Sequence, residues 1–323
     1  MTTTFNKMNV LITGGTGFVG INLIKRMLSL GACVRTTVHK KKPILIDDRI
    51  DYVTCDLLSM EDCKKAVADM DYVFMCAANT SGAAVIATTP LVHVTPNVIM
   101  NAQIMEAAYF AKVKKFIFLS SNAAYPPSAD RYVREDEMFN ADPYDVYFGV
   151  AWMKRYTEIL CRMYSEKLKV AMPSLVVRPS NIYGPYDDFD PATSHVMAAT
   201  IRKVVERQNP IKVWGTGNDV RDLIYIDDFI DGLLLAAEKI RTYDPINIAL
   251  GKGYSIKQLL AILMEIEGCL DLKIEYDTTK PSMIPIRLID VNKAEKQIEF
   301  RAQTDVREGM IKTIAWDKAN LMK

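Results

Sequence analysis

The residues most clearly suited to chemistry are the glycines of the stretch ITGGTGFVG, residues 12–20. Gly14, Gly17 and Gly20 directly follow an apolar strand pattern and open a helical pattern that runs to about Leu30. Glycine suits such a turn because the turn is tight, the backbone must approach a pyrophosphate, and the helix must pack closely on the strand. The helix start also offers free N–H groups and the positive end of its dipole to phosphates. The stretch predicts a dinucleotide-binding turn; the alternative is an ordinary strand–helix connection.

The end of the next strand bears on which dinucleotide binds. An acidic residue there would bond the adenosine ribose of NAD, whereas a basic residue accommodates the extra phosphate of NADP. The segment TTVHKKK, residues 36–42, has no acid, and His39, Lys40 and Lys41 follow at once. The pattern favours NADP over NAD, with a solvated basic loop as the alternative. Asp56, at the end of the third strand, is placed to meet the adenine amino group.

These residues need a scaffold that brings strand ends together. Short β-branched runs alternate with helical patterns, clearest at Asn97–Lys112 and Val150–Lys167. The predicted strands are Asn9–Thr13, Cys33–Val38, Tyr52–Cys55, Tyr72–Ala77, Lys115–Ser120 and Ser174–Arg178, with a late return to the sheet near Ile246–Leu250. Strands this apolar, alternating with helices, indicate an α/β fold with a parallel sheet covered on both faces.

After Arg178 the pattern becomes irregular, with loops rich in Pro, Gly and Asp and then short helices. This predicts a smaller lobe interleaved with the first. We expect residues 1–178 plus about 223–250 to form the dinucleotide-binding domain. Residues 179–222 plus about 251–323 would form the second lobe.

Composition excludes several other classes of protein. Half of the 323 residues are hydrophobic, so a sizeable core is available, and the net charge of +1 predicts neither a nucleic-acid nor a membrane partner. No stretch approaches the roughly 18 apolar residues that a membrane span needs, and the N-terminal residues lack a signal-peptide pattern. Six scattered cysteines without C-x-x-C spacing predict free thiols and no metal site. The expectation is a cytoplasmic enzyme.

Several further motifs carry a family resemblance that covers nearly the whole chain. They are GGTGFVG, DLLSMED, MCAAN, FLSSNAAYP, RPSNIYGP, VWGTGNDVRDLIYIDD and KPSMIPIRLIDVNKAEKQ. The chain resembles the extended short-chain dehydrogenase/reductases (NAD-dependent epimerase/dehydratase family) that act on nucleotide sugars. Within that family, NIYGPYDDFDPATSHV and TTKPSMIPIRLID look most like GDP-fucose synthase and its GDP-hexose relatives. The resemblance implies a Rossmann-type fold and a homodimer formed through the two clearest helices.

The resemblance also implies site residues. Ser121, four residues before Tyr125, fits the family's hydroxyl that bonds the substrate's C4 oxygen, with strand capping as the alternative. Lys154 fits the lysine of the family's Tyr-x-x-x-Lys pair, which holds the nicotinamide ribose and lowers the tyrosine pKa. Val150 then occupies the tyrosine position and cannot exchange a proton. The implied cofactor residues are Gly14, Gly17, Phe18, Val19, Gly20, His39, Lys40, Asp56, Leu57, Ala77 and Lys154.

Three other tyrosines are candidates for the missing acid. Tyr147 lies seven residues before Lys154, but reaches the site only if the helix starts late and the segment YFG folds back. Tyr144 is a poorer candidate, and Tyr186 stands where GDP-fucose synthase has its epimerisation histidine. Ring packing at a lobe boundary is the alternative for all three.

Asn122 and Ala123 replace the acidic pair of 4,6-dehydratases, which disfavours a dehydratase. The epimerisation histidine of GDP-fucose synthase and its cysteine in the serine loop are also missing, which disfavours a 3,5-epimerase step.

The second lobe supplies the expected grip on the nucleotide sugar. Family matches assign Asn181, Arg221 and Arg287 to the diphosphate or nucleotide, because a guanidinium pairs bidentately with phosphate. A surface salt bridge is the alternative for Arg221. His195 is either a helix cap or a substrate contact, and Trp214 either lines the sugar pocket or packs.

The predicted activity is hydride transfer at C4 of a nucleotide hexose, by 4-keto reduction or else by 4-epimerisation. The motifs above favour a GDP-linked hexose. Three alternatives stay open. One is an NADPH reductase of small carbonyl compounds, which the motif VWGTGNDVRD disfavours. Another is a non-catalytic cofactor-binding protein. The last is a recent or engineered Tyr-to-Val change in an active enzyme.

Overall fold

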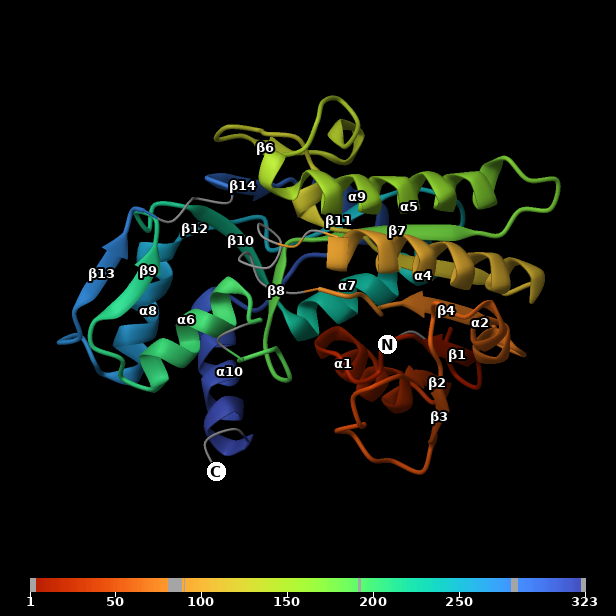
Figure 1. Cartoon of the computed structure of the whole chain (residues 1–323), viewed down its shortest axis with the longest axis horizontal. Coiled ribbons are helices and arrows are strands. Elements are labelled where there is room, and N and C mark those ends of the chain that lie inside the picture. The colour runs from red at the N-terminus through yellow and green to blue at the C-terminus, as the bar shows by residue number, and fades with distance from the viewer. Residues whose placement is uncertain (1–3, 81–88, 90, 191–192, 280–283, 321–323) are drawn as a thin grey trace.

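The computed structural model describes residues 4–80, 89, 91–190, 193–279 and 284–320. Its largest element is a parallel sheet of seven strands in the order β11-β7-β5-β4-β1-β2-β3 (Figure 1). The strands are β1 (Asn9–Ile12), β2 (Cys33–Val38), β3 (Ile50–Thr54), β4 (Tyr72–Met75), β5 (Lys115–Leu119), β7 (Ser174–Pro179) and β11 (Ile246–Ile248). The predicted strands are confirmed to within a few residues, and so is the doubly wound α/β fold.

Helices cover both faces of this sheet. On one face, α1 (Phe18–Ser29) and α7 (Ile226–Lys239) pack into a large core that continues into the second lobe. On the other face, α2 (Met60–Val67), α4 (Leu91–Phe110) and α5 (Phe148–Glu166) enclose a separate core. Strands buried from both sides must be apolar along their whole length, which is why they read as continuous hydrophobic runs in the sequence.

The second lobe lies at the other end of the molecule (Figure 1). Its larger sheet has the order β12-β10-β14-β6, and β8 pairs with β10. The strands are β6 (Tyr132–Val133), β8 (Asn181–Tyr183), β10 (Val220–Tyr225), β12 (Gly253–Ser255) and β14 (Ile286–Ile289). A two-stranded sheet joins β9 (Ile211–Trp214) to β13 (Ile274–Asp277). The remaining α-helices are α6 (Val196–Val205), α8 (Ile256–Glu267), α9 (Asn292–Ile298) and α10 (Val306–Asn320).

The chain crosses between the lobes more than once. Strand β11 returns to the large sheet beside β7, while β6, from the first part of the chain, pairs with β14 near the end. The lobe division at about residues 178, 223 and 250 stays an interpretation, and β6 is an addition to the second lobe that it did not include. Among the described residues, no helix is long and apolar enough to cross a membrane.

Candidate active site

All seven strands of the large sheet are parallel, so their carboxyl ends meet along one edge. The residues that follow those ends include Gly14 after β1, His39 after β2, Asp56 after β3, Ala77 after β4 and Ser121 after β5. An open parallel sheet binds its ligands at this edge. The fold therefore gathers the predicted cofactor residues where a dinucleotide would lie.

The glycine turn has the shape that a pyrophosphate needs. Gly14 adopts a φ of +72°, and a Cβ there would lie 2.8 Å from the Cα of Ala77. A Cβ on Gly20 would lie 2.3 Å from the carbonyl oxygen of Gly14. Gly17 is the N-cap of α1 and provides no side-chain cap, so the first N–H groups of the helix, which begins with Phe18 and Val19, remain available. This cradle fits a dinucleotide.

Two threonines that the sequence reasoning missed hold this turn in place. The Thr13 hydroxyl oxygen accepts hydrogen bonds from the backbone N–H groups of Cys76 and Ala77, at 3.1 and 3.0 Å. The Thr37 hydroxyl oxygen accepts one from Gly14, at 2.9 Å. In the sequence, a threonine at the end of each of two adjacent strands could have indicated these hydrogen bonds. These bonds fix the spacing between Gly14 and Ala77.

The adenosine end of the edge is open and polar. His39 and Lys40 are exposed, and the His39 Nε2 atom lies 3.9 Å from the Asp56 carboxylate. No acidic residue stands directly after β2, so this end accommodates a phosphate on the ribose. The Leu57 side chain is buried in the core beside α2, and its contact with the cofactor stays a prediction.

Ser121 and Ser120 have different roles. Ser120 is buried and donates its hydroxyl hydrogen bond to Glu158. Ser121 is half-buried, and its oxygen accepts a hydrogen bond from the N–H of Ala123, at 3.1 Å, which caps a short 3-10 helix at Asn122–Ala124. The Ser121 hydroxyl proton is not consumed by this cap. It can therefore still be donated to a substrate oxygen.

Lys154 reaches toward the same strand end. Its Nζ donates a hydrogen bond to the carbonyl oxygen of Leu119, at 2.8 Å, and lies 4.9 Å from the centroid of the Phe118 ring. Burial lowers the pKa of Lys154 to about 8, while the nearby Glu158 and Cys76 oppose that shift. The structure thus brings the Lys154 ammonium to Leu119 at the end of β5, and Leu119 is two positions before Ser121 in the chain.

A buried ion pair fixes the position of α5 against the sheet. Two nitrogens of Arg178 on β7 contact the two carboxylate oxygens of Glu158 at 2.6 and 3.1 Å, and both side chains are almost fully buried. Arg178 also donates to the Tyr125 hydroxyl, at 3.0 Å, which in turn donates to Asn247, at 2.7 Å. Tyr125 is therefore a structural residue, and the sequence reasoning did not identify this network.

Val150 lies in the first turn of α5, which begins at Phe148. It is one helical turn before Lys154, where the family tyrosine would stand, and it carries no group that exchanges a proton. Tyr147 is the N-cap residue and follows a 3-10 turn at Asp145–Tyr147. The helix begins directly after Tyr147, and the rise of an α-helix over seven residues corresponds to about 10 Å between Tyr147 and Lys154 along the axis. An acid role for Tyr147 stays a prediction.

Tyr186, another candidate acid, packs among side chains of α1 and α10, and its role as an acid stays a prediction. Its ring centroid lies 4.8 Å from that of Trp316 on α10, and the Lys25 ammonium of α1 lies 5.1 Å from the ring. Tyr186 adopts a φ of +69°, and this backbone conformation goes with a ring that packs between α1 and α10. The structure does not bring Tyr186 together with Lys154 and Ser121.

Two of the predicted substrate residues are cross-strand neighbours. Arg221 on β10 pairs in register with Arg287 on β14. Arg221 is partly accessible and lies 3.2 Å from Asp219, so its predicted alternative, a salt bridge, is present. Arg287 is 1% exposed, and it donates to the carbonyl oxygens of Tyr125 and Pro126, both at 3.1 Å. Burial lowers the pKa of Arg287 to about 10.

The other substrate candidates lie at the edges of this group. Asn181 begins β8, and its side-chain oxygen accepts a hydrogen bond from Asn122, at 3.3 Å. Asn122 also donates to the carbonyl oxygen of Pro179, at 2.9 Å, which ties the serine loop to β7. His195 is the exposed N-cap residue of α6 but makes no side-chain cap. Trp214 ends β9 with its side chain about half exposed. Ligand contacts of His195 and Trp214 stay predictions.

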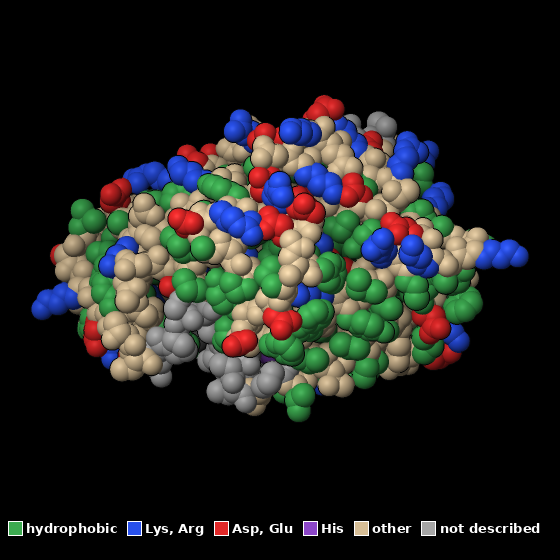
Figure 2. Space-filling view, turned by 90° about the horizontal axis from the view of Figure 1, so that it is seen from above, with side chains coloured by type: hydrophobic (Ala, Val, Ile, Leu, Met, Phe, Trp, Pro, Cys, Tyr) green, Lys and Arg blue, Asp and Glu red, His purple; other side chains and the backbone are tan. Residues whose placement is uncertain are grey.

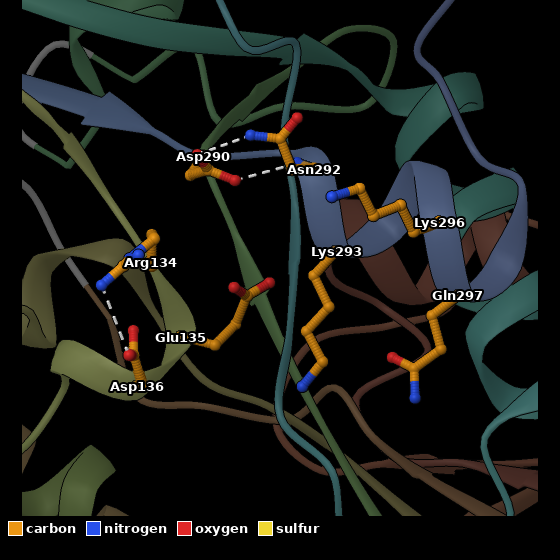
Figure 3. A pocket seen from close by; sticks show the side chains of 8 residues that line it. All are labelled: Arg134, Glu135, Asp136, Asp290, Asn292, Lys293, Lys296 and Gln297. Carbon is orange, nitrogen blue, oxygen red and sulfur yellow. Dashed lines mark hydrogen bonds and ion pairs between the residues drawn. The ribbon is translucent and has the colours of Figure 1, made fainter.

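A charged pocket of about 670 Å³ lies elsewhere on the molecule (Figure 3). It is lined by residues after β6 and β14, among them Arg134, Glu135, Asp290 and Lys293. Lys293 is already paired with Asp244, and Arg134 with Asp136. None of the predicted ligand residues lines this pocket. Among the described residues, no group of three metal-ligating side chains is found.

Comparison with known proteins agrees with this geometry. A probable GDP-L-fucose synthase of Oryza sativa subsp. japonica is 26% identical over 97% of this chain and 93% of its own length. A dTDP-4-dehydro-6-deoxy-D-allose reductase of Streptomyces bikiniensis is 27% identical over 95% of both chains. The structure of UDP-glucose 4-epimerase from Thermotoga maritima, with UDP-glucose, matches with a TM-score of 0.87 and 25% identity, over 97% of this chain and 100% of that one.

The family comparison covers most of the chain. Residues 10–249 match the model of the NAD dependent epimerase/dehydratase family. These residues hold the glycine turn, the Ser121 loop, the Lys154 helix and Arg221. With relatives that act on nucleotide sugars, the match makes this chain an NAD(P)-dependent enzyme of the extended short-chain dehydrogenase/reductase type. It belongs to the NAD dependent epimerase/dehydratase family.

Proposed function

We propose that this enzyme transfers hydride at C4 of a nucleotide hexose, with reduction of a GDP-linked 4-keto sugar as the main reaction and 4-epimerisation as the alternative. One observation carries the proposal. Lys154 reaches the end of β5 beside Ser121, and the adjoining lobe presents Arg221 and Arg287 side by side. The first pair suits the reacting carbon, and the second suits the diphosphate of the substrate. The similarity to a GDP-L-fucose synthase supports the choice of base.

Each residue then has a defined task. The bound nicotinamide dinucleotide supplies or accepts the hydride. Lys154 would hold the nicotinamide ribose, and Ser121 would donate its hydroxyl hydrogen bond to the oxygen at C4. Asn181 and the two arginines would hold the nucleotide diphosphate. Reduction also requires a proton on the C4 oxygen, and Val150 cannot deliver it. We therefore expect slow turnover in the natural chain.

Val150 also supports a second candidate, a protein that binds both ligands without appreciable turnover. Cofactor and sugar nucleotide would bind as in an active enzyme, because the glycine turn, Lys154 and the arginines are all in place. A reductase of small carbonyl compounds is less consistent with the structure, since it has no use for two adjacent arginines beside the site.

Two measurements test the proposal. Mass spectrometry of ligands released from the denatured protein should identify a nicotinamide dinucleotide and a nucleotide hexose. Absorbance of the reduced nicotinamide should then fall when a GDP-linked 4-keto hexose is added, faster than with the UDP- or dTDP-linked sugar. Oxidation of the dinucleotide only by sugar-free carbonyl compounds would contradict the proposal. Binding of both ligands without absorbance change would select the non-catalytic candidate.

A further inference from the structure

We propose that Tyr147 binds the substrate diphosphate together with Arg221 and is a substrate-positioning residue, in place of the acid role considered above. This inference rests on the proposed function, because it presumes a nucleotide-sugar substrate. It assigns a task to a tyrosine beside the vacant acid position that no part of the proposed mechanism uses.

The placement of Tyr147 at the start of α5 is the first argument. Tyr147 is the N-cap residue of that helix, seven residues or about two turns before Lys154. Its ring packs against the small core of Ala124, Tyr125 and Ile289. Because Ile289 ends β14, this core lies next to the strand that carries Arg287.

The second argument is the surroundings of the two arginines. The N–H of Tyr147 donates a hydrogen bond to the carbonyl oxygen of Tyr144, at 2.8 Å, so the two tyrosines share one tight turn. The guanidinium of Arg287 lies 5.7 Å from the centroid of the Tyr144 ring. Tyr147 packs against the core that contains Tyr125, and the Tyr125 carbonyl oxygen accepts a hydrogen bond from Arg287. Burial raises the pKa of Tyr147, and the charge of Arg221, the strand neighbour of Arg287, opposes that rise. Both tyrosines therefore lie near the arginine pair.

The third argument is that Arg287, unlike Arg221, has no anionic partner among the described residues. Two like charges opposite each other on neighbouring strands are unfavourable. Asp219 pairs with Arg221, but among the described residues the Nε of Arg287 is buried without a hydrogen-bond partner. A diphosphate would satisfy both guanidinium groups. Because burial keeps the phenol of Tyr147 protonated, it would donate a hydrogen bond to a phosphate oxygen and add no competing negative charge.

The variant Tyr147→Phe tests the inference, because it removes the hydroxyl group and keeps the ring. Calorimetric titration with GDP should show affinity lower by roughly tenfold to a hundredfold, the range for a hydrogen bond to a charged group. Binding of guanosine, which has no phosphate, and of NADPH should not change. In turnover, KM should rise and kcat should stay within a factor of about two, since uniform binding is lost. Tyr109→Phe, which removes the hydroxyl from a ring that packs on Tyr164, is the matched control.

A double-mutant cycle makes the assignment specific. Tyr147→Phe combined with Arg221→Ala should weaken GDP binding by less than the sum of the two single changes, because both contact the same phosphates. Additive losses would overturn a shared diphosphate contact. A kcat that collapses with unchanged GDP affinity would overturn the inference in favour of an acid role. Unchanged GDP binding by Tyr147→Phe would overturn the inference and leave the proposed function intact. If the natural chain binds neither GDP nor UDP, both the inference and the proposed function are refuted.

Discussion

At the scale of single residues, the decisive feature is a side chain that cannot do the family's chemistry. Val150 occupies the position one turn before Lys154. Tyr125 is buried against Arg178, Tyr186 packs on Trp316, and a diphosphate contact is proposed for Tyr147. Lys154, Ser121 and the glycine turn lie at the strand ends where the proposed function needs them. We therefore propose that the catalytic defect is confined to one side chain.

Restoring the phenol tests this conclusion. In Val150→Tyr, the Lys154 ammonium should lower the pKa of the new phenol, because residues four apart share a helix face and a nearby positive charge favours the phenolate. Proton transfer by a positioned side chain is typically worth about 10²–10⁴-fold, so turnover of the correct sugar nucleotide should rise by that order. Val150→Phe, which adds the ring without the hydroxyl, is the control. Equal rates for the two variants would contradict a vacant acid position.

The basic residues after β2 give a second prediction. NADP(H) should bind at least as tightly as NAD(H), because His39 stands where an NAD-binding chain would have an acid. Fluorescence titration of both cofactors measures the preference. In His39→Asp the new carboxylate would repel the ribose phosphate and bond the NAD ribose, so the ratio of the two affinities should move toward NAD. A natural chain that clearly prefers NAD would refute the assignment.

Arg221 gives a third prediction. Arg221→Ala should weaken the nucleotide sugar by about 1.5–3 kcal/mol, the usual worth of a hydrogen bond to a charged group, and leave the cofactor unaffected. Titration calorimetry with each ligand separates the two effects. Arg207→Ala, in which an exposed arginine of the same lobe is removed, serves as the control. Loss of affinity for both ligands, or for neither, would show that Arg221 does not hold the substrate.

At the scale of elements, alternating strand and helix patterns were enough to predict the large sheet, but helix starts were not. The helix predicted at Asn97 begins at Leu91, with Pro96 inside it. Proline lacks the N–H that would bond the carbonyl of Val92. In the structure the Asn79 side chain donates to that carbonyl instead, at 2.7 Å. A residue eighteen positions before Asn97 thus permits the longer helix, and no local pattern contains that information.

The ion pair between α5 and β7 yields a prediction at this scale. Glu158→Gln leaves the Arg178 charge buried without its partner, and breaking a buried pair in this way costs about 3–5 kcal/mol. Urea denaturation should show that loss in the free energy of unfolding. Glu166→Gln breaks the more exposed pair with Arg162 on the same helix and should cost under about 1 kcal/mol. Similar losses in both variants would mean that the buried pair does not fix α5.

At the scale of the whole molecule, sequence reasoning predicted two lobes but not how they interlock. Strand β6 has only two residues, and it pairs with β14 more than 150 positions later in the chain. Such a short segment has no periodicity to read. The same limit applies to the site. Gly14, Ser121 and Lys154 follow local patterns, whereas the register of Arg221 with Arg287 depends on pairing between distant strands.

The outer surface of α4 and α5 carries exposed hydrophobic side chains that suit contact with a second chain. Hydrophobic side chains gather on the side of the molecule along which these helices run (Figure 2). Phe148, Trp152, Tyr156 and Ile159 follow one another on a single exposed face of α5. Ile99 and Phe110 add exposed apolar surface on α4, which packs beside α5. Contiguous apolar patches of this kind mark interaction surfaces. We propose that a second copy of the chain covers this face.

The homodimer is testable with charge on that face. Tyr156→Glu combined with Ile159→Glu places two carboxylates in the middle of the proposed interface, where an unpaired buried charge is costly. Sedimentation should therefore give a dimer for the natural chain and a monomer for the variant. Ile311→Glu, at an equally exposed apolar residue of α10 outside this face, should stay dimeric. Because α5 carries Lys154 and Val150 on its other side, the monomer should also lose substrate affinity if dimerisation steadies that helix. A natural chain that sediments as a monomer would refute the homodimer, and a double variant that remains a dimer would place the interface elsewhere.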